Sequence, residues 1–152
     1  MVSMIEKKSG KAKFVFFSAL IVLVLDQITK YFVSVNITGP IPVILGVFHL
    51  VFIKNTGAGF GLFKGQQGLL IFISVFVVGL ILYYYNKIPA KGYVPLSVGL
   101  LLGGTIGNLI DRIRLGYVID FLDFRIWPSF NVADSAITVG AIMLMVYFMK
   151  KE

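Results

Sequence analysis

Two aspartates in the second half of the chain have the residue type and setting for hydrolysis. Asp120 lies in the run YVIDFLDF, and Asp134 follows fourteen residues later in FNVADS. Two carboxyl groups held together in a poorly hydrated pocket share one proton, because ionising both is costly. The ionised member can take a proton from water while the protonated member polarises a peptide carbonyl. Asp120 and Asp134 are therefore a candidate aspartyl dyad, which works without metal or thiol.

Asp134 also has an ordinary structural explanation. Asn131 is a favoured residue at the start of a helix, and an acid in the first helical turn suits the helix dipole. Asp120 has no helix end of its own to cap, so its position is harder to explain by structure alone.

Other catalytic groups are scarce in this sequence. The chain has no cysteine and a single histidine, His49, so thiolate chemistry, disulfides and a multi-histidine metal site are not expected. None of the serines lies in a Gly-x-Ser-x-Gly setting. We interpret His49, which lies in a β-prone stretch, as a surface or interfacial residue, and we expect no metal and no cofactor.

Two more polar groups lie within apolar segments at helical spacing. Asp26 and Lys30 are four residues apart and share a helix face. They fit a structural ion pair, with Lys30 reaching toward the interface, about as well as they fit a functional site.

A second polar group follows a row of glycines. Gly99, Gly103, Gly107 and Asp111 recur every four residues, and Gly104, Asn108 and Arg112 do the same one position on. Small residues at this spacing are typical of close transmembrane packing, which explains the glycines. Packing explains Asn108, Asp111 and Arg112 less well, and they suggest a scaffold that holds a polar group.

The elements that position these residues are membrane-spanning helices. Of the 152 residues, 58% are hydrophobic and 14% are charged, a composition outside that of soluble domains. Four apolar segments, 14–35, 68–85, 93–110 and 132–149, are each long enough to cross a bilayer. The first is read as a retained span rather than a signal peptide. We predict an all-α membrane protein, with residues 1–152 forming a single domain of four transmembrane helices.

The connections and flanking charges predict an orientation. The tails and the 86–92 loop carry eight basic residues against two acids, whereas the other side carries six against five. By the positive-inside rule both termini are cytoplasmic, and the net charge of +7 reflects membrane orientation rather than nucleic acid binding. The outer loops are then 36–67 and 111–131. In the first we predict two short strands with a turn over 43–53, then a short amphipathic segment (Phe60, Leu62, Phe63) on the membrane surface.

Five motifs, in this order, resemble signal peptidase II, the lipoprotein signal peptidase of bacteria. They are DQITK at 26–30, NTGAGFG at 55–61, GGTIGNLIDR at 103–112, VIDF at 118–121 and FNVAD at 130–134. One such motif would be weak, but five in register span most of the chain. One departure is Gly59, where the family usually has alanine, which should loosen that loop without removing a functional group.

The resemblance implies an aspartyl endopeptidase of the bacterial cytoplasmic (inner) membrane. Such an enzyme removes the signal peptide from diacylglyceryl-modified prolipoproteins on the amino side of the lipidated cysteine, and the cyclic peptide globomycin blocks it. It implies a monomer in membrane lipid that binds no nucleic acid, with an outer β-cradle, an interfacial helix and an active site near the outer leaflet. By position in the motifs, the catalytic residues are Asp120 and Asp134. The implied supporting and substrate-contacting residues are Asp26, Lys30, Asn55, Gly104, Asn108, Asp111, Arg112 and Asn131.

Two other functions remain as alternatives. The first is a small proton- or ion-coupled carrier, in which Asp26, Lys30, Asp111 and Arg112 form a relay. Four spans without visible inverted repeats make a carrier less attractive. The second is a non-catalytic membrane scaffold, in which glycines serve packing and charges serve orientation.

Overall fold

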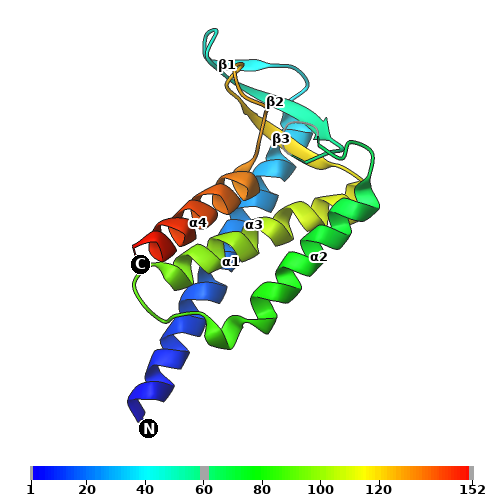
Figure 1. Ribbon diagram of the computed structural model, residues 1–152. Helices are drawn as coiled ribbons and strands as arrows, with labels where there is room; N and C mark the ends of the chain where they lie inside the picture. Colours follow the sequence, from blue (N-terminus) through cyan, green and yellow to red (C-terminus); the bar gives the residue numbers. More distant parts are fainter. Residues whose placement is uncertain (1, 59–61, 151–152) are drawn as a thin grey trace.

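The computed structural model describes residues 2–58 and 62–150. Helices pack side by side, a small sheet lies at one end of them, and both ends of the chain lie toward the other end (Figure 1). The elements in chain order are α1 (Val2–Asn36), β1 (Ile41–Ile44), β2 (Phe48–Asn55), α2 (Gln67–Tyr83), the short 3-10 helix η2 (Tyr85–Lys87), α3 (Val94–Leu115), β3 (Val118–Asp123) and α4 (Val132–Met149).

Helix α3 is central, because it packs against α1, α2 and α4. Its glycines allow these close approaches. A Cβ atom on Gly103 would lie 2.5 Å from the carbonyl oxygen of Ala19 in α1, and one on Gly104 would lie 2.5 Å from that of Ala133 in α4. Any side chain there would push backbone apart, so the predicted packing role of the glycines is supported.

The helices are apolar enough for a membrane. The segments Lys13–Asn36, Val94–Leu115 and Val132–Met149 each have the length and composition of a membrane span. Helix α2 is equally apolar but has only 17 residues, which is about 26 Å of helix. Three candidate spans and a shorter apolar helix are therefore found in the described residues, and the fourth span stays a prediction.

Two helices extend well beyond their predicted membrane spans, which are 93–110 in α3 and 14–35 in α1. Helix α4 has the predicted bounds, but α3 continues past residue 110 to Leu115, where Gly116 with φ 77° forms a left-handed cap. The charged residues after 110 suggested a helix end, yet Asp111 is buried by protein rather than exposed to lipid. Helix α1 begins at Val2, because the lysine-rich segment continues the helix ahead of its apolar part. Within it, the candidate span Lys13–Asn36 agrees with the predicted span 14–35.

The sheet is antiparallel with strand order β1-β2-β3. Strands β1 and β2 and the turn between them confirm the predicted hairpin, whereas β3 was not predicted. The predicted interfacial helix is absent from the described part of its segment, because residues 62–65 form turns. Phe63 and Gly65 have positive φ angles there, which interrupt a helix. Phe60 and Gly59 lie outside the described residues.

Replacing Gly103 with alanine tests the close contact between α1 and α3. The new methyl group would meet backbone of Ala19, so we expect a loss of about 1–3 kcal/mol in the free energy of unfolding. Gly79→Ala in α2 is the matched control, because nothing lies within 4 Å of its Cβ position, and it should be neutral or stabilising. Denaturant unfolding in detergent measures both, and equal stability of the two variants would contradict the packing role of Gly103.

Candidate active site

Asp120 enters the site from β3, where it is almost fully buried. Its carboxyl group accepts two hydrogen bonds from side-chain amides. Asn55 at the end of β2 donates to Oδ2 at 2.8 Å, and Asn131 donates to Oδ1 at 2.8 Å. Both oxygens of Asp120 are thus held by neutral donors from neighbouring elements.

Asp134 enters from the first turn of α4 as part of a capping box. The Asn131 side chain accepts from the Asp134 backbone N–H at 2.9 Å, and the Asp134 carboxyl accepts from the Asn131 backbone N–H at 3.3 Å. The predicted capping role of Asn131 is therefore confirmed. The other oxygen of Asp134 accepts from the Asn108 amide of α3 at 2.7 Å, so this acid does more than end a helix.

The two aspartates meet around Asn131. Its side-chain amide donates to Asp120, and its backbone N–H donates to Asp134. Asn108 strengthens the link, since it donates to Asp134 and accepts from the Asn131 amide at 3.2 Å. Residues from β3 and α4 thus converge on one pair of asparagines, so the carboxyl groups of Asp120 and Asp134 share hydrogen-bonding partners.

Burial raises the pKa of Asp120 to about 7. Loss of hydration is the main cause, and the nearby charge of Asp134 raises the pKa further. The hydrogen bonds from Asn55 and Asn131 and the charge of Lys30 oppose this rise. A carboxyl group whose pKa lies near neutrality suits general acid–base catalysis.

Lys30, Asp26 and Asp111 form a buried ion cluster that contacts the two aspartates' hydrogen-bonding partner Asn108. The Lys30 ammonium lies 2.8 Å from Asp26 and 3.0 Å from Asp111, and all three side chains are almost fully buried. It also donates to Asn108 at 2.9 Å. The predicted Asp26–Lys30 pair exists, but Lys30 turns into the protein rather than toward the interface.

The two acids of this cluster also fix the backbone beside the dyad. Asp26 accepts from the N–H of Ala133 at 2.9 Å, and Asp111 accepts from the N–H of Ile119 at 3.1 Å. Ala133 and Ile119 are the residues immediately before Asp134 and Asp120. Each buried acid therefore anchors one strand or helix segment that carries a candidate catalytic aspartate.

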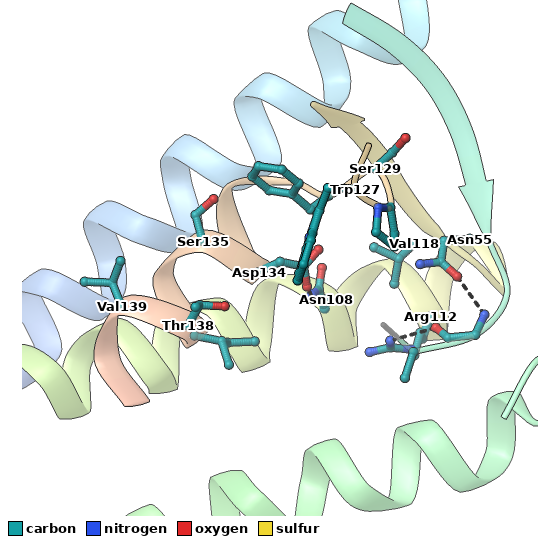
Figure 2. A pocket seen from close by; sticks show the side chains of 15 residues that line it. Asn55, Asn108, Arg112, Val118, Trp127, Ser129, Asp134, Ser135, Thr138 and Val139 are labelled. Atoms are coloured by element: carbon teal, nitrogen blue, oxygen red, sulfur yellow. Dashed lines mark hydrogen bonds between the residues drawn. The ribbon is translucent and has the colours of Figure 1, made fainter. Parts of the chain in front are cut away.

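A cavity of about 500 Å³ opens beside the site. Asp134, Asn108 and Arg112 line it together with Trp127, and Figure 2 labels all four side chains. Arg112 donates to the carbonyl of Gly57 at 3.4 Å, which ties α3 to the loop after β2 (Figure 2). The cavity wall is mainly apolar with several polar side chains, as in binding sites for small molecules and peptides.

Most of the predicted site residues come together, but Gly104 contributes close packing and not a polar group. Gly104 carries no polar side chain and permits the contact of α3 with Ala133, just before Asp134. Gln27 was missed, although its amide lies 3.1 Å from Asp111 and 3.2 Å from Asp26. The only signal for Gln27 in the sequence is a polar amide next to Asp26 in an apolar helix.

His49 was misplaced by the sequence interpretation. It is buried, with 6% of its surface exposed, and its Nδ1 accepts from Arg125 at 3.1 Å. The surface assignment was wrong because β2 is the central strand, flanked by β1 and β3. Within residues 2–58 and 62–150, no group of three or more His, Cys, Asp or Glu side chains is arranged to hold a metal ion.

Comparison with known proteins matches this site to a family. The model of the family described as signal peptidase (SPase) II matches residues 18–150. The lipoprotein signal peptidase of Halothermothrix orenii is 49% identical over 91% of this chain and 97% of its own length. That of Moorella thermoacetica is 46% identical over 83% of this chain and 86% of its own. The chain belongs to the signal peptidase II family.

Solved structures agree with this membership of the signal peptidase II family. Two structures, both described as a bacterial membrane enzyme, superimpose with TM-scores of 0.83 and 0.80 at 30% and 29% identity. They cover 88% and 90% of this chain, and 86% and 92% of their own chains. The carrier alternative is not favoured by these relatives, and a non-catalytic scaffold finds no support among them.

The titration of Asp120 should follow its neighbours. The midpoint of its titration should lie near pH 7 in the native protein. The midpoint should fall in Asp134→Asn, because a repelling charge is lost. It should rise in Asn55→Ala, because a hydrogen-bond donor to the carboxylate is lost. In the unfolded chain the pKa of Asp120 is near 3.8. The protonated carboxyl of Asp120 therefore contributes to the free energy of unfolding fully below pH 3.8, and this contribution is lost as the pH rises toward 7. Carboxyl carbon NMR measures the midpoints, and a midpoint near 4 in the native protein would contradict the burial effect.

Replacing Lys30 with methionine tests the buried ion cluster. Two carboxylates would lose their cation in a dry setting, so we expect about 3–5 kcal/mol lower free energy of unfolding. Lys64→Met is the control, since Lys64 is exposed and should change stability by under about 0.5 kcal/mol. Denaturant unfolding compares the two, and a stable Lys30→Met protein would show that the cluster is not needed.

Proposed function

We propose that this chain is an aspartyl endopeptidase that removes signal peptides from diacylglyceryl-modified prolipoproteins, on the amino side of the lipidated cysteine. Membership in the signal peptidase II family supports the peptidase activity and the prolipoprotein substrate. The observation that supports the aspartyl type is the convergence of Asp120 and Asp134 on Asn131 beside a cavity.

In the proposed mechanism the two acids have different tasks. Asp120, whose pKa is about 7, holds the shared proton and donates a hydrogen bond to the scissile carbonyl. Asp134 lines the cavity and takes a proton from the attacking water. The water oxygen bonds to the carbonyl carbon to give a tetrahedral intermediate. Its collapse breaks the C–N bond, and a proton passes from the acids to the leaving nitrogen.

The surrounding groups support this assignment. The asparagines keep both carboxyls in place without adding a charge, and the buried ion cluster fixes the backbone before each acid. Asn55 and Arg112 join the β2 end of the site to α3 through Gly57. The apolar cavity wall, with Trp127, Ile137 and Val139, suits an acylated, hydrophobic substrate.

We further propose a placement in the bacterial cytoplasmic (inner) membrane. Helix α2 would serve as the fourth span, with a modest mismatch in length. The termini would be cytoplasmic by the charge asymmetry of the sequence. The sheet and the start of α4 lie at the end of the bundle away from the termini (Figure 1). Asp120 belongs to β3 and Asp134 to the first turn of α4, so the active site would be near the outer leaflet, where a lipid-anchored substrate presents its bond. The chain would act as a monomer in membrane lipid.

Asparagine substitutions at the dyad test the mechanism. Asp120→Asn and Asp134→Asn should each lower cleavage of a diacylglyceryl-cysteine peptide at least about a thousandfold, because neither amide can exchange the proton that the dyad needs. Asp123→Asn is the control, since Asp123 lies in the same strand but faces Arg125 and should retain activity. Cleavage followed by mass spectrometry gives the rates, and globomycin should inhibit the native protein.

Thermal unfolding must accompany these rates, so that loss of cleavage is not mistaken for loss of fold. Appreciable turnover by both dyad variants would exclude the aspartyl mechanism. Failure of the folded native protein to cleave any lipidated peptide would exclude the peptidase function itself.

A further inference from the structure

A second cavity, of about 350 Å³, lies between α1, α3 and the sheet. Its lining differs from that of the first cavity. Gln27, Lys30 and Asp111, at or beside the buried ion cluster, form one part of it. Residues of α1, β2, α3 and β3 and the segment before β3 form the rest, and most of these are exposed. The ion network that holds the dyad is therefore a wall of this second cavity.

Two exposed cations line this cavity, Lys54 of β2 and Arg114 of α3. In the part of the chain that the structure describes, neither forms an ion pair with an acid. The Lys54 ammonium lies 5.1 Å from the centre of the Tyr117 ring and 6.0 Å from that of Phe52, so aromatic rings help to hold it at the cavity. The two charges thus remain available for an anion.

The buried part of the cavity is less favourable for an anion than this cationic part. Lys30 shares its one positive charge between Asp26 and Asp111, which leaves an excess of negative charge there when both acids are ionised. Lys54 and Arg114 bring two positive charges to the exposed side. An anion would therefore bind between Lys54 and Arg114, with the phenol groups of Tyr31 and Tyr117 as further donors from the lining.

The two helices that line this cavity, α1 and α3, also carry exposed apolar side chains. Ile28 of α1 and Ile113 of α3 are 48% and 64% exposed, and both belong to segments with the composition of membrane spans. Tyrosines beside such surface are typical of the membrane interface. The two helices that line the cavity thus bring together cations for a phosphate and exposed apolar side chains for acyl chains, and such basic groups attract anionic lipid headgroups.

We propose that this second cavity binds the phosphate of an anionic phospholipid headgroup, with Lys54 and Arg114 as its cationic contacts. The proposal rests on the membrane placement given above but not on peptidase activity. Because Lys30 and Asp111 line the same cavity, a bound lipid would pack against the network that anchors the residues before Asp120 and Asp134.

Lipid binding can be measured directly by native mass spectrometry of the whole chain in neutral detergent. Titration with phosphatidylglycerol should show one site that is tighter than any site for phosphatidylcholine. The double variant Lys54→Gln/Arg114→Gln should weaken phosphatidylglycerol binding about tenfold or more. Lys64→Gln/Lys91→Gln removes two charges from exposed lysines elsewhere and should leave the affinity unchanged, and Lys54→Arg should retain it.

Each other outcome contradicts the lipid site. Equal loss in both double variants would indicate general charge attraction, and no loss in Lys54→Gln/Arg114→Gln would exclude these contacts. If millimolar inorganic phosphate displaces phosphatidylglycerol, the site binds free phosphate rather than a lipid. The measurement reads bound lipid and not cleavage, so its failure would leave the peptidase proposal intact.

Discussion

A single ammonium group, that of Lys30, is the centre on which the site end of the bundle depends. A charge in a dry interior is costly unless it is paired and hydrogen-bonded. Lys30 meets this requirement with Asp26 from its own helix and with Asp111 and Asn108 from α3. One cation for two acids leaves negative charge, which the N–H groups of Ala133 and Ile119 help to stabilise. These ion pairs and hydrogen bonds form only where α1, α3, β3 and the start of α4 meet.

Close helix packing and this electrostatic requirement depend on each other. A Cβ atom on Gly107 would lie 2.6 Å from Oδ2 of Asp26, so only glycine lets the carboxylate of α1 lie against α3. Gly104 likewise lets the first turn of α4 approach α3, which brings Asp134 within reach of Asn108. The glycines that packing alone seemed to explain thus also set the distances on which the polar network depends.

The sequence predicts the polar residues of this site better than it predicts their arrangement. Asp120, Asp134 and Asn108 stand out because polar groups in apolar surroundings need partners, and the capping box follows from local spacing. Strand β3 was missed because its first four residues are all buried, which removes the alternation that marks a strand with one exposed face. The outer loop was predicted to begin at residue 111, although Asp111 continues the four-residue pattern of the glycines, because its burial by other protein segments is a tertiary property.

The unequal surroundings of the two aspartates bear on how a proposed dyad would divide its work. Asp120 is 2% exposed and is held by two amides, whereas Asp134 lines the cavity and sits in the first turn of α4, where the helix dipole favours negative charge. Environments that separate two carboxyl groups in this way assign one as acid and the other as base. Asn131 fixes both positions at once, since it caps α4 and donates to Asp120. In the proposed mechanism, the division of tasks would therefore depend on the same hydrogen bonds that begin the last helix.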